Sequence, residues 1–105
     1  MKDIPLSEQY RIAALDWVDK DSAARILEES KTAILAQWIS EHGDIPVSRA
    51  ENKVKASDKW FQFLDNMVST RSEANKAKIQ VEYIRMRFSE EIGRDANYRI
   101  ERKLG

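Results

Sequence analysis

The chain has no cysteine, and only three glycines and two prolines occur among its 105 residues. Without cysteine there is no disulfide, no thiol nucleophile, no thiolate zinc site and no iron–sulfur cluster. The few glycines are too scattered for a phosphate-binding loop or a nucleophile elbow, which need closely spaced glycines. These absences exclude several common classes of enzyme.

Net charge and long apolar runs are also missing. The 18 basic and 18 acidic side chains balance, so net charge points neither to a nucleic acid nor to an anionic membrane. No apolar run approaches the roughly 20 residues that span a bilayer, and the first residues lack the apolar core of a signal peptide. We therefore expect a cytoplasmic protein without a membrane partner.

Glycine and proline interrupt an otherwise helical pattern in the middle of the chain. Gly43 is suited to the left-handed conformation that ends a helix, and Pro46 cannot continue that helix. Ser48 and Glu51 have the spacing of a capping box at the start of a second helix. The sequence therefore predicts an all-α protein, a long antiparallel helical hairpin that resembles a coiled coil.

The two arms of this hairpin form one domain. The predicted domain covers 1–105, with a first arm over 7–42, a turn over 43–47 and a second arm over 48–103. Ser7 is placed to cap the first arm, whose polar run 19–22 leaves two interpretations open, two helices or one kinked helix. Apolar residues recur every seven residues in the second arm and favour one long helix. Its weakest point is the hydroxyl cluster at 69–72, where a break would instead give a three-helix bundle.

The arms differ in length, and this predicts self-association. At about 1.5 Å per residue they extend roughly 50 Å and 80 Å. Folding at the turn sets Trp17 near Ala74 and Ala77, and Ile26 near Phe63. The first arm reaches only to the level of about residue 83 of the second arm. The apolar side chains of the second arm beyond that level therefore have no intrachain cover. These side chains form the predicted interface of a homodimer or higher helical-bundle oligomer: Ile84, Phe88, Ile92, Ile100 and Leu104.

The charges of the two arms are complementary. Residues 1–47 contain five basic and nine acidic side chains, whereas residues 71–105 contain nine basic and six acidic ones. This contrast favours antiparallel packing, either within one chain or between two chains.

No residue set identifies a reaction. The only histidine, His42, lies at a predicted helix end, where the helix dipole favours a cation. Adjacent glutamates such as Glu28 and Glu29 point about 100° apart on a helix and do not converge on a metal. The tryptophans fall on apolar stripes and are expected in the core. We therefore expect no enzyme activity, no catalytic residue, no metal and no cofactor.

The C-terminal region offers an alternative function. Basic and aromatic side chains gather there: Arg85, Arg87, Arg94, Tyr98, Arg99, Arg102 and Lys103. Arginine binds phosphates and tyrosine stacks on unpaired bases, which suits a nucleic-acid-binding accessory protein of replication or recombination. The intervening acidic residues are typical instead of an ion-paired or partner-facing surface helix.

Four helical runs resemble small accessory proteins encoded in bacteriophage and prophage genomes. They are 15–18, 23–31, 74–78 and 81–83. The resemblance covers most of the chain but carries no catalytic signature. It implies a bacterial cytoplasmic setting and a role around phage DNA metabolism or particle assembly. Together, these observations favour a non-enzymatic interaction or assembly protein whose partner is itself, with another protein or a nucleic acid as further possible partners.

Overall fold

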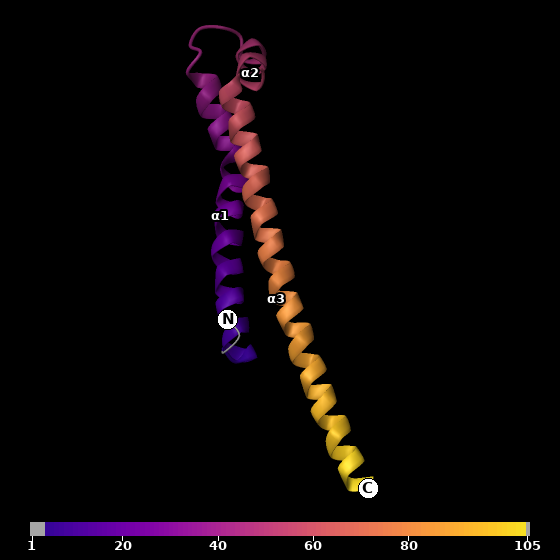
Figure 1. Ribbon diagram of the computed structural model, residues 1–105. Coiled ribbons are helices and arrows are strands. Elements are labelled where there is room, and N and C mark those ends of the chain that lie inside the picture. The colour runs from indigo at the N-terminus through magenta and orange to yellow at the C-terminus, as the bar shows by residue number, and fades with distance from the viewer. Residues whose placement is uncertain (1–3, 105) are drawn as a thin grey trace.

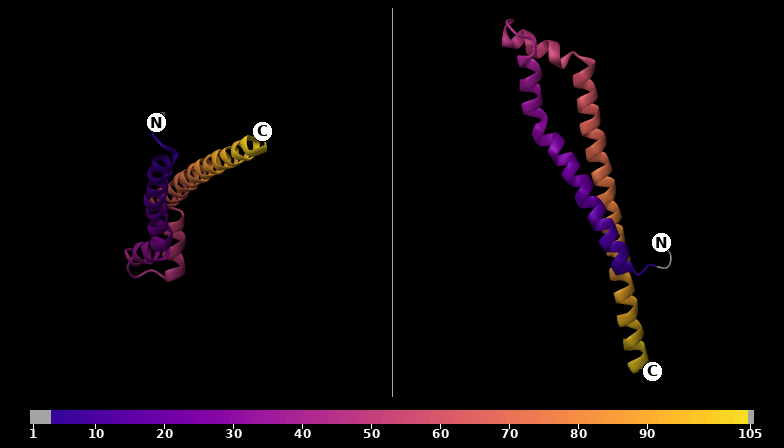
Figure 2. Two further views of the ribbon diagram at one scale, coloured as in Figure 1. Left: turned by 90° about the horizontal axis from the view of Figure 1, so that it is seen from below. Right: turned by 90° about the vertical axis from the view of Figure 1, so that its left-hand side faces the viewer.

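The computed structural model describes residues 4–104, with side chains as far as Lys103. This part of the chain forms three helices and no strand: α1 (Leu6–Ser40), α2 (Val47–Lys55) and α3 (Asp58–Leu104). α1 and α3 run antiparallel, and α2 joins them at one end (Figures 1 and 2). The molecule measures 85 × 23 × 17 Å. The predicted all-α hairpin is confirmed.

α1 is a single helix of 35 residues. It begins after Pro5, whose carbonyl accepts hydrogen bonds from the amides of residues 8 and 9, so Ser7 lies within the helix and does not cap it. The polar run 19–22 does not interrupt α1. Asp21 pairs with Arg25 one turn later at 3.0 Å, which supports the helix across this run.

The turn ends one helix as predicted but starts the next differently. Gly43 has a φ of +69°, the left-handed conformation that closes a helix. α2 begins at Val47, after Pro46, and its first turn has no side-chain cap. The predicted capping box of Ser48 and Glu51 is therefore wrong.

The second arm is divided near its start, so the prediction of one helix from residue 48 is wrong. The break falls at Ser57, between α2 and α3. The Ser57 hydroxyl accepts a hydrogen bond from the Trp60 amide at 3.2 Å and donates one to the Val54 carbonyl at 2.6 Å. It thereby caps α3. α3 then continues through 69–72, where the Thr70 hydroxyl bonds to a carbonyl of the preceding turn at 2.7 Å.

The core is a narrow seam between the arms. Its buried side chains are Ala24, Ala50, Val54, Trp60, Ala74, Ala77, Val81 and Ile84. Bulky aromatic rings gather at the turn end, where Trp38 meets Trp60 edge-on with centroids 5.9 Å apart. Alanines follow along the arms and allow the two helices to approach closely. Large residues thus fill the wide end of the hairpin and small ones the middle.

The arms pair in a different register from the predicted one. Tyr10 lies beside Arg85. The predicted register sets Tyr10 near residue 80, so the observed partner lies more than one helical turn further along α3. Ile26 is exposed, and Phe63 packs near Trp38 at 6.1 Å, so the predicted contact of Ile26 with Phe63 is wrong. The physical reason is that α2 bridges the end of the hairpin and displaces the start of α3.

Candidate interaction surface

α3 extends well beyond the start of α1 (Figure 1). Phe88 lies across from Leu6, the first residue of α1. We call residues 89–104 the distal overhang, which at about 1.5 Å per residue is roughly 25 Å long. Its side chains are exposed as far as residue 103. Among residues 4–104, no other segment packs against the distal overhang.

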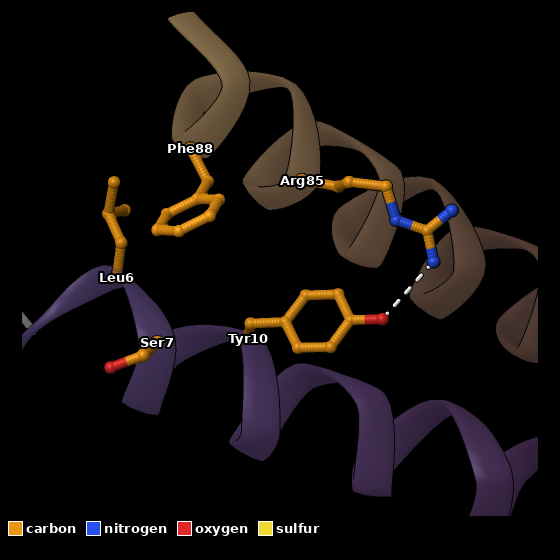
Figure 3. A pocket seen from close by; sticks show the side chains of 5 residues that line it. All are labelled: Leu6, Ser7, Tyr10, Arg85 and Phe88. Atoms are coloured by element: carbon orange, nitrogen blue, oxygen red, sulfur yellow. Dashed lines mark hydrogen bonds between the residues drawn. The ribbon is translucent and has the colours of Figure 1, made fainter. Parts of the chain in front are cut away.

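A groove marks the place where the two arms part. Leu6, Ser7, Tyr10, Arg85 and Phe88 line a hollow of about 310 Å³. Figure 3 shows the side chains of Leu6 and Phe88 directed toward each other from the two helices. The lining is mostly apolar, and the groove leads directly into the overhang.

Arg85 closes the inner end of this groove. Its Nη2 donates a hydrogen bond to the Tyr10 hydroxyl at 3.1 Å, and its guanidinium lies 5.9 Å from the centre of the Tyr10 ring (Figure 3). This hydrogen bond, which Arg85 donates to Tyr10, raises the pKa of Arg85 above its ordinary value. Arg85, which the sequence grouped with possible phosphate contacts, therefore fastens the start of α1 to α3.

The structure supports only part of the reasoning behind the predicted oligomer interface. Ile84 is 3% exposed, so the expectation that it lacks an intrachain cover is wrong. The shifted register carries α1 further along α3 and buries it. Phe88, Ile92 and Ile100 are 48, 54 and 56% exposed. The side chain of Leu104 lies outside the described residues.

The three exposed residues do not share one face of the helix. Phe88 and Ile92 are one turn apart and form a common patch. Ile100 lies about 120° around the helix from Phe88, given about 100° per residue. The exposed apolar surface of the distal half is therefore centred on Phe88 and Ile92.

The other residues of the predicted nucleic-acid set are all exposed and lie on the distal half of α3: Arg87, Arg94, Tyr98, Arg99, Arg102 and Lys103. Arg102 lies over the Tyr98 ring at 5.7 Å, and Arg87 lies over the Tyr83 ring at 6.0 Å. None of these basic side chains forms an ion pair within residues 4–104. The structure does not gather them into one stripe, since Arg94 and Arg99 point about 140° apart.

A charged clamp joins the middle of the two arms. Arg71 binds both carboxylate oxygens of Glu28 at 2.7 and 2.8 Å and Asp21 at 2.7 Å. Its hydrogen bonds lower the pKa of both carboxyl groups. The sequence did not reveal this clamp, because Arg71 is separated from its partners by the turn and its position depends on the register.

A second apolar surface also escaped the sequence analysis. Four large side chains of α3, each 62–69% exposed, lie on the face that α1 and α2 leave uncovered: Phe61, Val68, Ile79 and Met86. We call this set the back stripe. The signal was present as spacings of seven, eleven and seven residues, which return to nearly the same line on a helix.

The described residues thus define an elongated all-α hairpin with exposed apolar surfaces. No group of three or more metal-ligating side chains is placed to hold an ion in this part of the chain. Nor is any of its helices long and apolar enough to cross a bilayer. Comparison with protein-family models, curated proteins and solved structures gives no match.

Proposed function

We propose that this protein is a non-enzymatic helical assembly module that self-associates through the distal half of α3. The observation that carries the proposal is the exposed patch of Phe88 and Ile92, where α3 continues past the start of α1. Full burial of such a side chain contributes about 1.5–3 kcal/mol. In a symmetric dimer, each patch covers its twin.

The shape of the hairpin and its groove support this proposal. The radius of gyration is 23.6 Å, against about 13 Å for a compact domain of this length. An extended chain exposes much surface for its mass and gains more from association than a compact one does. The groove beside Phe88 enlarges the patch toward the hairpin.

The setting is also part of the proposal. The resemblance to small phage and prophage accessory proteins supports a bacterial cytoplasmic protein that works in phage DNA metabolism or particle assembly. In either process, a hairpin that pairs through its free end acts as a spacer or connector, with another protein as a further partner.

The variant Phe88→Glu with Ile92→Glu tests the self-association. We expect the parent to sediment as a dimer or larger at tens of micromolar, and the variant to have at most half the parental mass. Burying two carboxylates in the interface costs more than the contact returns. Sedimentation equilibrium gives the mass, and circular dichroism checks that the helices remain.

A matched control places the same two charges elsewhere on the overhang. Ser89→Glu with Asn97→Glu lies off the face of Phe88 and is expected to keep the parental mass. A monomeric parent, or equal masses for the parent and the Phe88 and Ile92 variant, contradicts the proposal.

Nucleic-acid binding by an accessory protein of replication or recombination is the second candidate. The observation in its favour is that the exposed arginines of the overhang are free of ion pairs within residues 4–104. If the protein has this function, the parent is expected to bind single- or double-stranded DNA with an affinity that falls steeply as the salt concentration rises. Changing Arg94, Arg99 and Arg102 to Gln is then expected to abolish binding.

Fluorescence anisotropy with labelled oligonucleotides at two salt concentrations measures this. The control changes Lys53, Lys55 and Lys59, near the turn, to Gln and is expected to keep the parental affinity. Equal affinity in the arginine variant and the parent means that these arginines of the overhang do not contribute to DNA binding.

A further inference from the structure

The back stripe of α3 is a long apolar surface that no described part of the hairpin covers. We infer that α3 of a second copy packs antiparallel on this stripe, so that the chain has two self-association surfaces. The inference goes beyond the proposed function, because it concerns a different face of α3 and stands whether or not the overhangs pair. Four observations carry it: the spacing of the stripe, the charges beside it, the exposed area and the contrast with α1.

The spacing of the stripe is symmetric about its own centre. Phe61 and Met86 lie equally far from the midpoint of the stripe, and so do Val68 and Ile79. Two antiparallel copies of the stripe therefore place Phe61 against Met86 and Val68 against Ile79 at both ends of one interface. A stripe that is complementary to itself in this way suits a two-fold axis between the helices.

The charges along one edge of the stripe favour the same orientation. Asp58 and Asp65 flank its first half, and Lys76 and Arg87 flank its second half, all of them exposed. By the helical period, these four residues lie on the same side of the stripe, 40–80° from the line of Phe61 at about 100° per residue. Antiparallel pairing brings this edge of one copy beside the same edge of the other, with the acidic half of one beside the basic half of its twin.

The exposed area is large enough for such an interface. The chain exposes 8264 Å², whereas a compact folded monomer of its mass exposes about 6,000 Å². A stable interface of ordinary size removes about 800 Å² from each partner. The excess therefore accommodates a second copy on the back stripe as well as a pairing of the overhangs.

The back of α1 is less suited to a second copy. It also exposes apolar side chains, among them Val18 and Ile26. Val18 and Ile26 lie about 80° apart around α1 at about 100° per residue, so they do not form one line as the back stripe does. Side chains of both signs, Arg25 and Glu29, border them. The observations therefore favour α3 as the surface for a second copy.

The test compares three variants by sedimentation equilibrium. Val68→Glu with Ile79→Glu blocks the back stripe, Phe88→Glu with Ile92→Glu blocks the overhang, and a fourfold variant blocks both. Each double variant is expected to remain a dimer through its intact surface, and the fourfold variant to be a monomer. Val68 and Ile79 are exposed, so their change is expected to leave the helix content unaltered.

Val18→Glu with Ile26→Glu, on the back of α1, is the matched control and is expected to keep the parental mass. If the Phe88 and Ile92 variant is already monomeric, the inference is overturned while the proposed function stands. If that variant keeps the parental mass but the Val68 and Ile79 variant dissociates, the proposed function fails and the inference stands. Equal dissociation by the control overturns the choice of α3 as the docking face, and points to α1 or to a partner that contacts both helices.

Spin labels test the orientation, and the absence of native cysteine makes single attachment sites easy to build. In the Phe88 and Ile92 variant, labels are attached through Glu73→Cys, near the proposed axis, and through Gln62→Cys, far from it. Antiparallel pairing makes the distance between copies short at residue 73 and longer at residue 62, with an axial offset of roughly 35 Å. Equal distances at the two sites indicate parallel pairing and overturn the inference.

Discussion

Replacing Trp60 by Ala is expected to lower the free energy of unfolding by about 3–5 kcal/mol, the usual cost of removing a buried aromatic side chain. Trp60 is 5% exposed. It stacks on Phe63 with centroids 5.5 Å apart and meets the edge of Trp38. The remainder of the seam is largely alanine, valine and isoleucine, so no other described core side chain fills a comparable volume.

Urea denaturation followed by circular dichroism measures this loss. Trp60→Phe keeps an aromatic ring in the cluster and is expected to cost less. Tyr98→Ala, at an exposed aromatic residue of the overhang, is expected to change stability by well under 1 kcal/mol. A loss below 1 kcal/mol for Trp60→Ala is inconsistent with an aromatic cluster that holds the turn end together.

The outline of the fold was predictable because it depends on local chemistry. Gly43 and Pro46 interrupt a long helical pattern in any tertiary context, which fixed the hairpin. The break at Ser57 has no glycine or proline beside it. A serine interrupts a continuous helix and caps a new one only where tertiary packing stabilises the bend. Since the register follows from that break, the clamp of Arg71 on Glu28 could not be predicted either.

The part of the candidate surface that depends on the lengths of the two arms could be predicted from the sequence. The overhang follows from the unequal arms, and the exposure of Phe88 and Ile92 agrees with it. Ile84 was wrongly included because the position of α2 decides how far α1 reaches. The back stripe was missed because α3 carries two apolar stripes, and periodicity alone does not tell which one faces α1.

Ala24→Leu is expected to destabilise the hairpin by about 1–3 kcal/mol, because added methyl and methylene groups have no room in a closely packed seam. Ala24 is completely buried in α1, as Ala74 is in α3. Small side chains on both helices let the arms approach at the level of the Arg71 clamp. Thermal and urea unfolding measure the loss, and Ala33→Leu, at an exposed site on α1, is expected to be nearly neutral.

The same substitution is expected to reduce the acid sensitivity of the hairpin. Arg71 lowers the pKa values of Glu28 and Asp21 from their ordinary 4.5 and 3.8. The unfolded chain therefore binds more protons in this range, and the parent loses this stabilisation as the pH falls through and below those values. In Ala24→Leu, the wider seam draws Arg71 away from its partners, so the pKa values return toward normal. Urea unfolding between pH 3 and pH 7 is then expected to show a shallower decline than in the parent, and an unchanged decline means that the clamp survives the added bulk.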